Sequence, residues 1–572
     1  MAVEKLIVDH IDTWTTALQT RSTAGRGSSG KIDLYGIKKL RELILELAVR
    51  GKLVPQDPND EPASVLLERI AAEKAELVKQ GKIKKQKPLP EISEEEKPFE
   101  LPAGWEWVRL GTLFNSIQSG GTPSKINPAF WGGDIPWASV KDLGSSQYIS
   151  KTQDYITEAG LLSGSKLADS GDVLICTRMG LGKIAIASCP IAFNQDLKAV
   201  KLTSHIIPNF FFNTYSTVKI KGTGTTVEGI KQEQLVNYIT GFPPFNEQNK
   251  IVVKVKELMS LCDQLEQHTL TSLDAHQQLV ETLLTTLTDS QNADELAENW
   301  ARISKHFDTL FTTEASIDAL KQTILQLAVM GKLVPQDPND EPASELLKRI
   351  AQEKAQLVKD GKIKKQKPLP PVNDEDKLFE IPFNWEHVYL NDICEVITDG
   401  THQTPKYTDR GRPFISAQCV KPFKFMPENC RYVSEEDYQQ YIKNRTPEIN
   451  DILLARVGAG IGECAVIDVN LEFSIYVSTA LIKPIKCHIN SNYLCLWLNS
   501  PIGRLFSSRY TYGKGVSQGN LNLSLIRTFV ISIPPYKEQN LIVEKVRTYL
   551  SICEKLKSKI QSAQQTQLHL AD

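Results

Sequence analysis

Residues 51–90 read GKLVPQDPNDEPASVLLERIAAEKAELVKQGKIKKQKPLP, and residues 331–370 read GKLVPQDPNDEPASELLKRIAQEKAQLVKDGKIKKQKPLP. Position 51 corresponds to position 331, an offset of 280, and the two stretches agree at 35 of their 40 positions. Self-similarity at a fixed spacing indicates a chain built from repeated structural units. We therefore expect one unit to occur twice in this fold.

The similarity extends outward from these stretches, stops, and then returns. FELPAGWEWVRL (99–110) resembles FEIPFNWEHVYL (379–390), and PPFNEQNKIV (243–252) resembles PPYKEQNLIV (534–543) at an offset of 291. Between these entry and exit motifs the two copies diverge, and the second divergent block is longer by 11, the difference between the two offsets. This layout predicts similar frames that hold two different domains.

The chain of 572 residues is long enough for two to four domains. The divergent blocks contain short β-type runs, such as 172–175 and 451–454, separated by Gly, Asn and Ser turns, which predicts compact mixed α/β domains. The predicted boundaries are 1–100 (N-terminal helical region with linker), 101–243 (first divergent domain), 244–380 (central helical region with repeated linker), 381–534 (second divergent domain) and 535–572 (C-terminal helix).

A helix is predicted over 60–81, with Asp60 as N-cap, Pro62 in the first turn and Gly81 at the end. Its apolar face comprises Leu66, Leu67, Ile70, Leu77 and Val78. The five repeat differences, at 65, 68, 72, 76 and 80, lie on the opposite stripe. Two interpretations fit equally: both copies dock like partners, or a recent duplication has drifted on its solvent face.

Two long helices are predicted over 247–290 and 538–570, each with an apolar seam typical of a coiled coil. The seams comprise Ile251, Val255, Leu258, Cys262 and Leu265, and Ile542, Val546, Tyr549, Cys553, Leu556 and Ile560. At 1.5 Å per residue such a helix spans roughly 50 Å, more than one DNA turn of about 34 Å. The predicted fold class is α/β (α+β): two mixed domains separated by long helices that pair as an antiparallel coiled coil, with a pseudo-twofold internal repeat.

Composition excludes several classes of protein. The net charge of −2 rules out a broad basic field, so any DNA contact must be local. The ten cysteines form no CxxC pair, so neither a zinc site nor a disulfide framework is expected. The sequence has no signal peptide and no apolar stretch of the length that a membrane-spanning helix needs, which predicts a soluble, cytoplasmic protein.

Two segments imitate enzyme motifs without completing them. GRGSSGK (25–31) matches the spacing of a phosphate-binding loop, but Ile32 replaces the required Ser or Thr, so a glycine linker is expected. IPPY (533–536) resembles the DPPY-type loop of adenine methyltransferases, but Ile533 stands where that loop requires Asp or Asn. The chain is therefore expected to be non-catalytic, with no catalytic, cofactor-binding or metal-binding residues of its own.

Taken together, the duplicated entries, the exits and the coiled-coil patterns resemble the specificity subunits of type I restriction–modification systems over essentially the whole chain. The long N-terminal extension and the GKLVPQDPNDEPAS repeats are most similar to the branch called type IB. The resemblance implies that each divergent block is a target recognition domain that reads half of a split, asymmetric double-stranded DNA site. It also implies two methylation subunits and two restriction/translocase subunits as partners, which use S-adenosylmethionine, ATP and Mg²⁺, with adenine as the methylated base.

Candidate base-reading residues are polar and charged side chains on loops, because sequence is read at base edges whereas phosphate contacts set the register. In the first block they are Gln118, Ser119, Thr122, Ser124, Lys141, Arg178, Lys183 and the 222–226 turn with Thr225 and Thr226. In the second block they are Thr398, His402, Lys406, Arg410, Arg412, Arg456, Lys514 and Gln518.

Two other functions remain as alternatives. A nucleic-acid enzyme in its own right requires a methyltransferase or nuclease motif, and none is found in the sequence. The hypothesis of a helical scaffold protein does not explain why two divergent, loop-rich blocks lie inside similar frames. The lysine-rich runs at 82–87 and 362–367 fit either phosphate contact or a solvated linker.

Overall fold

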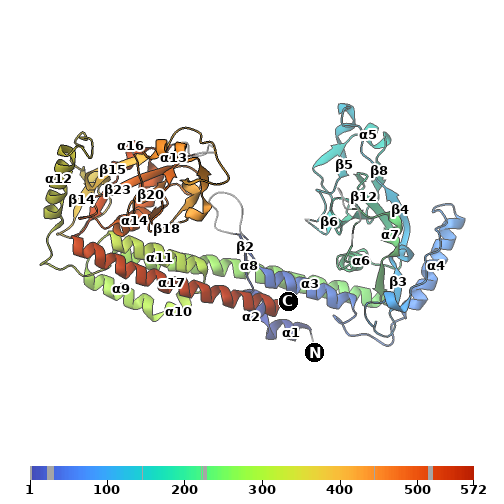
Figure 1. Ribbon diagram of the computed structural model, residues 1–572. Coiled ribbons are helices and arrows are strands. Elements are labelled where there is room, and N and C mark those ends of the chain that lie inside the picture. Colours follow the sequence, from blue (N-terminus) through green and yellow to red (C-terminus); the bar gives the residue numbers. More distant parts are fainter. Residues whose placement is uncertain are drawn as a thin grey trace. The chain divides into compact units, whose positions relative to one another are not determined.

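The computed structural model divides into two compact units (Figure 1). It describes residues 3–21, 31–144, 146–220, 222, 229–443, 445–512 and 519–572. Unit 1 comprises Met1–Thr20, Ile32–Leu270 and Thr566–Asp572, and unit 2 comprises Arg21–Lys31 and Thr271–Gln565. Each unit contains one copy of the repeat, and we describe each by itself.

Unit 1 combines helices with a β-rich domain. Its helices are α1 (Val3–Asp9), α2 (Ile11–Thr16), α3 (Tyr35–Val49), α4 (Ala63–Lys79), α5 (Glu158–Leu162), α6 (Pro208–Tyr215), α7 (Gln232–Asn237) and the start of α8 (Phe245–Asp289). Its main strands are β3 (Glu106–Arg109), β4 (Phe114–Ser119), β5 (Trp131–Ala138), β6 (Tyr148–Ile149), β7 (Asp154–Ile156), β8 (Lys166–Ala168), β9 (Val173–Cys176), β10 (Ile184–Ala187), β11 (Ile191–Phe193), β12 (Leu197–Leu202) and β13 (Ile239–Phe242). Short strands β1 (Gln19–Arg21) and β2 (Lys31–Asp33) form a separate pair, and η1 (Glu94–Glu96), η2 (Leu110–Leu113) and η3 (Pro128–Phe130) are 3-10 turns.

Two sheets form the domain of unit 1, in the orders β4-β12-β9-β10-β6 and β7-β5-β11-β8. The run at 172–175 was predicted as a strand, and β9 confirms it with four fully buried residues. The entry strand β3 and the exit strand β13 pair antiparallel, with Glu106 opposite Phe242. The chain therefore enters and leaves the domain through adjacent strands.

Unit 2 repeats this plan. Its helices are the remainder of α8, then α9 (Ala293–Lys305), α10 (Phe307–Leu310), α11 (Glu314–Val329), α12 (Ala343–Lys359), α13 (Glu435–Ile442), α14 (Ser491–Asn499), α15 (Pro501–Arg509), α16 (Leu523–Ile526) and most of α17 (Tyr536–Ala571). Its strands are β14 (Glu386–Tyr389), β15 (Cys394–Asp399), β16 (Arg412–Ile415), β17 (Val420–Lys421), β18 (Lys424–Phe425), β19 (Arg431–Val433), β20 (Ile452–Ala455), β21 (Cys464–Val466), β22 (Ser474–Ile475), β23 (Thr479–Pro484), β24 (Thr511–Tyr512), β25 (Asn520–Leu521) and β26 (Val530–Ile533). The 3-10 turns are η4 (Asp374–Asp376), η5 (Leu390–Ile393), η6 (Ala417–Cys419) and η7 (Pro427–Asn429).

The sheets of unit 2 run β15-β23-β20-β21 and β19-β16-β22, with the entry–exit pair β14-β26. These orders match β4-β12-β9-β10, β7-β5-β11 and β3-β13 of unit 1 strand for strand. The predicted strand at 451–454 appears as β20, and Glu386 of the entry lies opposite Ile533 of the exit. The predicted mixed α/β fold with an internal repeat is therefore confirmed at the level of topology.

The predicted helix over 60–81 is α4, but it begins at Ala63 with Pro62 as N-cap. Asp60 does not cap it, because its carboxylate accepts a hydrogen bond from Asn246 Nδ2 at 2.9 Å and contacts Lys250 Nζ at 3.3 Å. The predicted apolar face packs inward, with Leu66 and Ile70 buried. Gly81 follows the helix with a positive φ of 71°, as a helix-ending glycine requires.

The two predicted long helices are α8 and α17, each within two residues of its predicted bounds. The two helices were predicted to pair as an antiparallel coiled coil, and in unit 2 Val280, Leu284 and Leu287 of α8 share a buried core with the α17 seam. In unit 1, however, Ile251, Val255 and Leu258 of α8 share a buried core with Ile37, Leu40 and Ile44 of α3. In unit 2 the seam of α17 shares a core with Ile317, Leu320 and Ile324 of α11.

Equivalent ion pairs join the two helices in both units, and in unit 2 the further pair Lys557–Asp318 shows that α11 and α17 run antiparallel. Arg41 of α3 lies 2.7 Å from Asp263 of α8, and the repeat-related Lys321 of α11 contacts Glu554 of α17 at 2.5 Å. The two contacts are equivalent, because 41 and 321 differ by 280 and 263 and 554 differ by 291. The frame is therefore repeated down to individual charge pairs.

Candidate nucleic-acid interface

Each divergent domain is fastened to its long helix by a buried tryptophan and glutamate. In unit 1 Trp105 Nε1 donates to Glu247 Oε2 at 2.9 Å, and Gln56 Nε2 donates to Glu247 Oε1 at 3.1 Å. In unit 2 the repeat-related Trp385 Nε1 donates to Glu538 Oε2 at 3.0 Å and to Gln336 Oε1 at 3.2 Å. We call these two sets, Gln56–Trp105–Glu247 and Gln336–Trp385–Glu538, the joints.

The glutamine that follows each joint glutamate holds a second loop of the domain. Gln248 accepts from Ile207 N at 3.0 Å, and Gln539 accepts from Asn490 N at 2.8 Å. Both glutamines are fully buried. The Glu-Gln pairs shared by the two exit motifs are therefore structural, because they position the domain on the helix.

Burial raises the pKa of both joint glutamates. The pKa of Glu538 rises to about 7, and the Trp385 hydrogen bond opposes this rise because it favours the charged form. Burial also raises the pKa of Glu247, with Gln56 and Trp105 opposing it. The joints therefore hold carboxylates whose charge is costly to bury.

In the first domain, predicted residues gather where β4 ends. Ser119, the last residue of β4, accepts from Lys198 Nζ at 2.5 Å, and Thr122 donates to Gln195 Oε1 at 2.5 Å. Arg178 lies 3.8 Å from Asp196 and keeps 55% of its side chain exposed. We call the set Ser119, Thr122, Arg178 and residues 195–198 the first edge.

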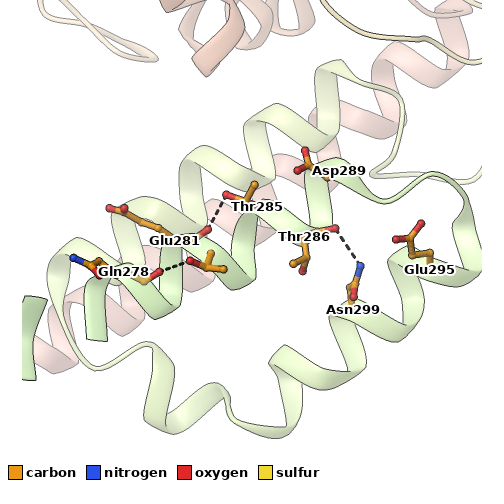
Figure 2. A pocket seen from close by; sticks show the side chains of 8 residues that line it. Gln278, Glu281, Thr285, Thr286, Asp289, Glu295 and Asn299 are labelled. Carbon is orange, nitrogen blue, oxygen red and sulfur yellow. Dashed lines mark hydrogen bonds between the residues drawn. The ribbon is translucent and has the colours of Figure 1, made fainter. Parts of the chain in front are cut away.

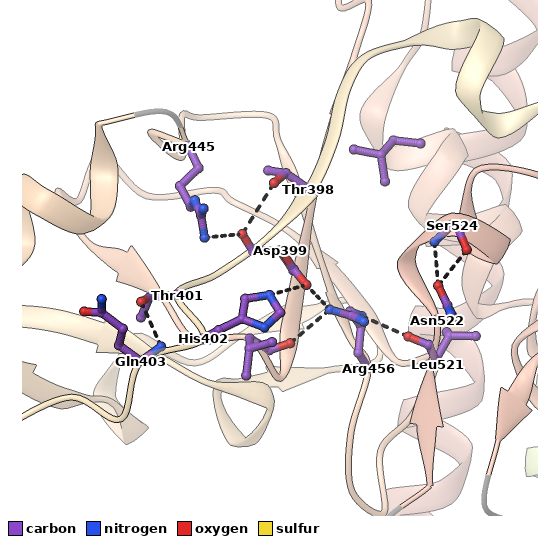
Figure 3. A network of polar contacts seen from close by, with 12 residues as sticks. Thr398, Asp399, Thr401, His402, Gln403, Arg445, Arg456, Leu521, Asn522 and Ser524 are labelled. Atoms are coloured by element: carbon purple, nitrogen blue, oxygen red, sulfur yellow. Dashed lines mark hydrogen bonds and ion pairs between the residues drawn. The ribbon is translucent and has the colours of Figure 1, made fainter. Parts of the chain in front are cut away.

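In the second domain, the equivalent strand β15 ends at Asp399, which organises a polar network (Figure 3). Asp399 Oδ2 pairs with Arg456 Nη1 and lies 3.2 Å from His402 Nε2, and the Asp399 carbonyl accepts from Arg445 at 3.0 Å. Arg456 also donates to the carbonyls of Leu521 at 2.9 Å and Val477 at 3.2 Å. We call the set Asp399, His402, Arg445 and Arg456 the second edge.

The two edges occupy the same place in their domains. Ser119 and Asp399 are separated by the repeat offset of 280, and each is followed by a glycine. A Cβ on Gly120 would lie 2.2 Å from the carbonyl oxygen of Asn194, and one on Gly400 would lie 2.1 Å from that of Ile475. No side chain fits such a close approach, so both strands end where a neighbouring segment's backbone packs against a glycine.

Comparison with known proteins identifies the family. The family model described as "Type I restriction modification DNA specificity domain" matches residues 102–275 and 382–563. The chain is 47% identical over 604 residues to the EcoAI specificity subunit of Escherichia coli, covering 100% of this chain and 99% of that protein. It is also 47% identical over 600 residues to the Escherichia coli EcoEI specificity subunit, with the same coverage.

The chain belongs to the type I restriction–modification specificity subunits. The predicted family and its type IB-like character are thereby confirmed. Two solved structures are also similar to it: a chain from a study of complex assembly and conformational transition of the type I restriction–modification system (16% identity, 83% of this chain and 97% of that one, TM-score 0.44), and the HsdS subunit of Thermoanaerobacter tengcongensis (18% identity, 83% and 98%, TM-score 0.38).

The remaining predicted residues of the first recognition domain lie on its surface. Gln118 is exposed beside Ser119, Ser124 and Lys141 are exposed on loops, and Lys183 is half-buried with its Nζ donating to Val140 O at 3.2 Å. Thr225 and Thr226 lie outside the described residues. DNA contact by these side chains stays a prediction.

Two predicted arginines of the second recognition domain make several contacts within the domain. Arg456 is only 7% exposed, because its guanidinium is held by Asp399 and two carbonyls. Arg412 pairs with Glu435 and Glu472 and lies over the Tyr438 ring at 5.0 Å. Both arginines therefore make contacts within the domain, and DNA contact by either of them stays a prediction.

The other predicted residues of this specificity subunit's second domain fall into two groups. Thr398 is half-buried in β15, and His402, Lys406 and Arg410 are exposed on the loop that follows it. Lys514 and Gln518 lie outside the described residues. Base reading by these side chains stays a prediction.

Three residues that hold the two edges together, Asp399, Lys198 and Asp196, were not predicted from the sequence. Asp399 has a signal in the sequence, because it precedes a glycine and is repeat-related to Ser119, a predicted residue. Asp196 and Lys198 have no such signal, since the backbone pairing of β12 with β4 and β9 brings them to the edge.

A groove between α8 and α9 contains none of the predicted residues (Figure 2). It is lined by Gln278, Glu281, Thr282, Thr285, Thr286, Asp289, Glu295 and Asn299, and Asn299 Nδ2 donates to the Thr286 carbonyl at 3.1 Å. Three carboxylates in one groove repel phosphate, so this groove is unsuited to nucleic acid.

The described part of the chain has neither a metal cluster nor a membrane-spanning helix. There, no group of three or more His, Cys, Asp or Glu side chains is placed to hold a metal ion. None of the described helices combines the length and apolarity needed to cross a membrane. The segment 25–31, which imitates a phosphate-binding loop, is described only at Lys31. The IPPY segment joins β26 to α17, as expected of a domain exit.

Proposed function

We propose that each recognition domain of this specificity subunit reads one half of a split, asymmetric DNA sequence. One observation carries the proposal. The two domains are held by equivalent joints, but the strand ends at equivalent places in them present different polar groups. The first edge presents Ser119, Lys198 and Arg178, whereas the second presents Asp399 and His402. Different donors and acceptors at equivalent places recognise different base pairs.

The frame is proposed to dock two methylation subunits, and two restriction/translocase subunits complete the restriction enzyme. The repeated frame supports two like partners, because α4 and α12 are nearly identical whereas the recognition domains have diverged. Here Arg69 and Arg349 even keep the same ion pairs, with Glu61 and Glu341.

Catalysis is proposed to belong entirely to the partners. The methylation subunits supply S-adenosylmethionine and methylate adenine at N6 after it is flipped out of the duplex, and the restriction subunits use ATP and Mg²⁺. This chain contributes recognition and no catalytic residues, and it acts in the cytoplasm.

The proposal is tested by co-expressing the chain with its methylation subunit and sequencing adenine methylation genome-wide. We expect a split motif that is methylated only when both proteins are present. Methylation by this chain alone contradicts the non-catalytic assignment. No methylation with its partner favours the alternative scaffold function.

A domain exchange tests the assignment of one domain to one half-site. Replacing residues 101–243 with the block of a relative is expected to change one half of the methylated motif and leave the other half and the spacer unchanged. A change in both halves contradicts the assignment. The reciprocal exchange of residues 381–534 is the matched control, because it must alter only the other half.

A further inference from the structure

The turn that joins β9 to β10 in the first recognition domain has an equivalent turn between β20 and β21 in the second. Thr177 N donates to Asp196 O and its carbonyl accepts from Ile230 N, while Arg456 N donates to Ser478 O and its carbonyl accepts from Leu521 N. Thr177 and Arg456 are therefore equivalent. Two residues later, Met179 of the first turn corresponds to Gly458 of the second.

Both positions adopt left-handed backbone, with φ of 60° at Met179 and 94° at Gly458. Glycine takes this conformation freely, whereas a residue with a Cβ loses roughly 1–2 kcal/mol. Among the described residues, only Phe423 and Asn450 share this property with Met179 outside glycine. Phe423 is anchored by its N–H on the Cys464 carbonyl and Asn450 by its N–H on the Ile467 carbonyl, and asparagine tolerates the conformation well.

The Met179 side chain gains nothing from the domain that compensates for this cost, because it is 68% exposed. A glycine there would relieve the backbone, as it does in the second turn. Strained residues of this kind concentrate at functional sites, where the side chain is needed for a contact outside the fold.

The surroundings of Met179 identify the chemistry of that contact. The preceding Arg178 is exposed, Lys183 closes the same turn, and Lys183 Nζ donates to the carbonyl of Val140, next to the exposed Lys141. An exposed apolar side chain that follows an exposed arginine, in a turn that also holds Lys183, suits a polyanion with apolar parts between its charges. Duplex DNA has this composition, with phosphates outside and base edges, including thymine methyl groups, within the grooves.

We propose that Met179 contacts a base in the half-site read by the first recognition domain and contributes to its sequence specificity. This inference rests on the proposed function. Arg178, Lys141 and Lys183 bring the turn to the phosphates, and Met179 makes the apolar contact that distinguishes one base pair from another. The second domain, with glycine at this place, reads its half-site without such a contact.

The test uses the complex of the full chain with its methylation subunits and a duplex carrying the motif found by methylation sequencing. Met179→Gly is expected to bind this duplex about tenfold more weakly, as loss of one apolar base contact implies. Base-pair changes in the first half-site should then matter less than they do for the unchanged protein. Met179→Leu should retain both affinity and discrimination.

Thermal melting is the control for correct folding. Met179→Gly should melt no lower than the unchanged chain, because the turn prefers glycine. Leu162→Ala is the matched control, since Leu162 is 82% exposed in the same domain but lies at the end of α5. It should leave DNA binding unchanged. Unaltered discrimination in Met179→Gly, or an equal loss on all sequences, overturns the inference. Absence of any split motif with the unchanged chain instead refutes the proposed function.

Discussion

The joints and the edges of this specificity subunit differ in how far the two repeat copies have diverged. At the joints, Trp105–Glu247 and Trp385–Glu538 keep the same residues and nearly the same separation, 2.9 and 3.0 Å. At the edges, Ser119 and Asp399 occupy equivalent strand ends but differ in charge and in partners. A buried contact must fit the same protein neighbours in both copies. An edge residue must instead fit the molecule that binds to it, which can differ between the two domains.

The comparison predicts the largest effect where a joint is broken. Trp385→Ala should lower the free energy of unfolding by about 5 kcal/mol, because it leaves a cavity and removes a hydrogen bond from the buried Glu538. Urea unfolding measures this loss, and Trp105→Ala should behave alike. The control is Trp300→Ala on α9, which is 44% exposed and should change little. Equal losses at Trp300 and Trp385 contradict the special role of the joint.

The arginines of the two edges should differ in role: Arg456 in stability and Arg178 in DNA binding. Arg456→Ala is expected to destabilise the protein by about 3–5 kcal/mol, because it leaves the Asp399 carboxylate buried without its partner. Arg178→Ala breaks an exposed pair and should cost at most about 1 kcal/mol of stability. Its effect should fall on DNA binding, by about 1–3 kcal/mol at one half-site if it contacts guanine. Chemical unfolding and DNA titration of both variants test this division, and a stable Arg456→Ala variant refutes it.

The joints should also respond to pH. The folded protein keeps a proton on Glu538 up to about pH 7, whereas in the unfolded chain this carboxyl loses its proton near its ordinary pKa, about 4. Between these values the folded state binds more protons, so stability falls as pH rises, by at most about 4 kcal/mol. Glu538→Gln should remove most of this slope. Urea unfolding between about pH 5 and pH 7.5 measures it, and an unchanged slope in Glu538→Gln contradicts the assignment.

The smallest effect is expected on the solvent stripe of α4. Giving it the residues of α12 (Val65→Glu, Glu68→Lys, Ala72→Gln, Glu76→Gln and Gln80→Asp) should change stability by less than about 1 kcal/mol and leave methylation unchanged. This result fits both interpretations of the stripe that the sequence allows. Loss of methylation with unchanged stability shows instead that the stripe contacts a partner.

Much of the frame is predictable, because its signals are local. The seams of α8 and α17 follow a helical period, so their ends are predicted to within two residues. The partners of these seams are not predictable in the same way: α3 and α11 lie far away in the chain, and periodicity gives the face of a helix without its neighbour. Asp60 is misjudged for a related reason, since its carboxylate is occupied by Asn246 of another helix.

The edges are harder to predict, because they depend on strand pairing between distant segments. Arg456 has the residue type and loop position expected of a base-contacting residue on the surface. It is buried instead, because it pairs with Asp399, which lies far earlier in the chain. Ser119, Thr122 and Arg178 are predicted individually, but only the pairing of β12 with β4 and β9 places them together. Residue type therefore predicts the chemistry of an edge, and topology decides which residues belong to it.

The adjacent entry and exit strands give each recognition domain a two-strand stalk. Because β3 and β13, like β14 and β26, pair side by side, the stalk fixes the distance between the ends of the domain whatever the chain does beyond it. The second domain is longer than the first, yet neither its stalk nor its joint is altered. If each domain reads one half-site as proposed, exchanging the segment between the two stalk strands is expected to change the DNA sequence recognised and to leave the frame unchanged.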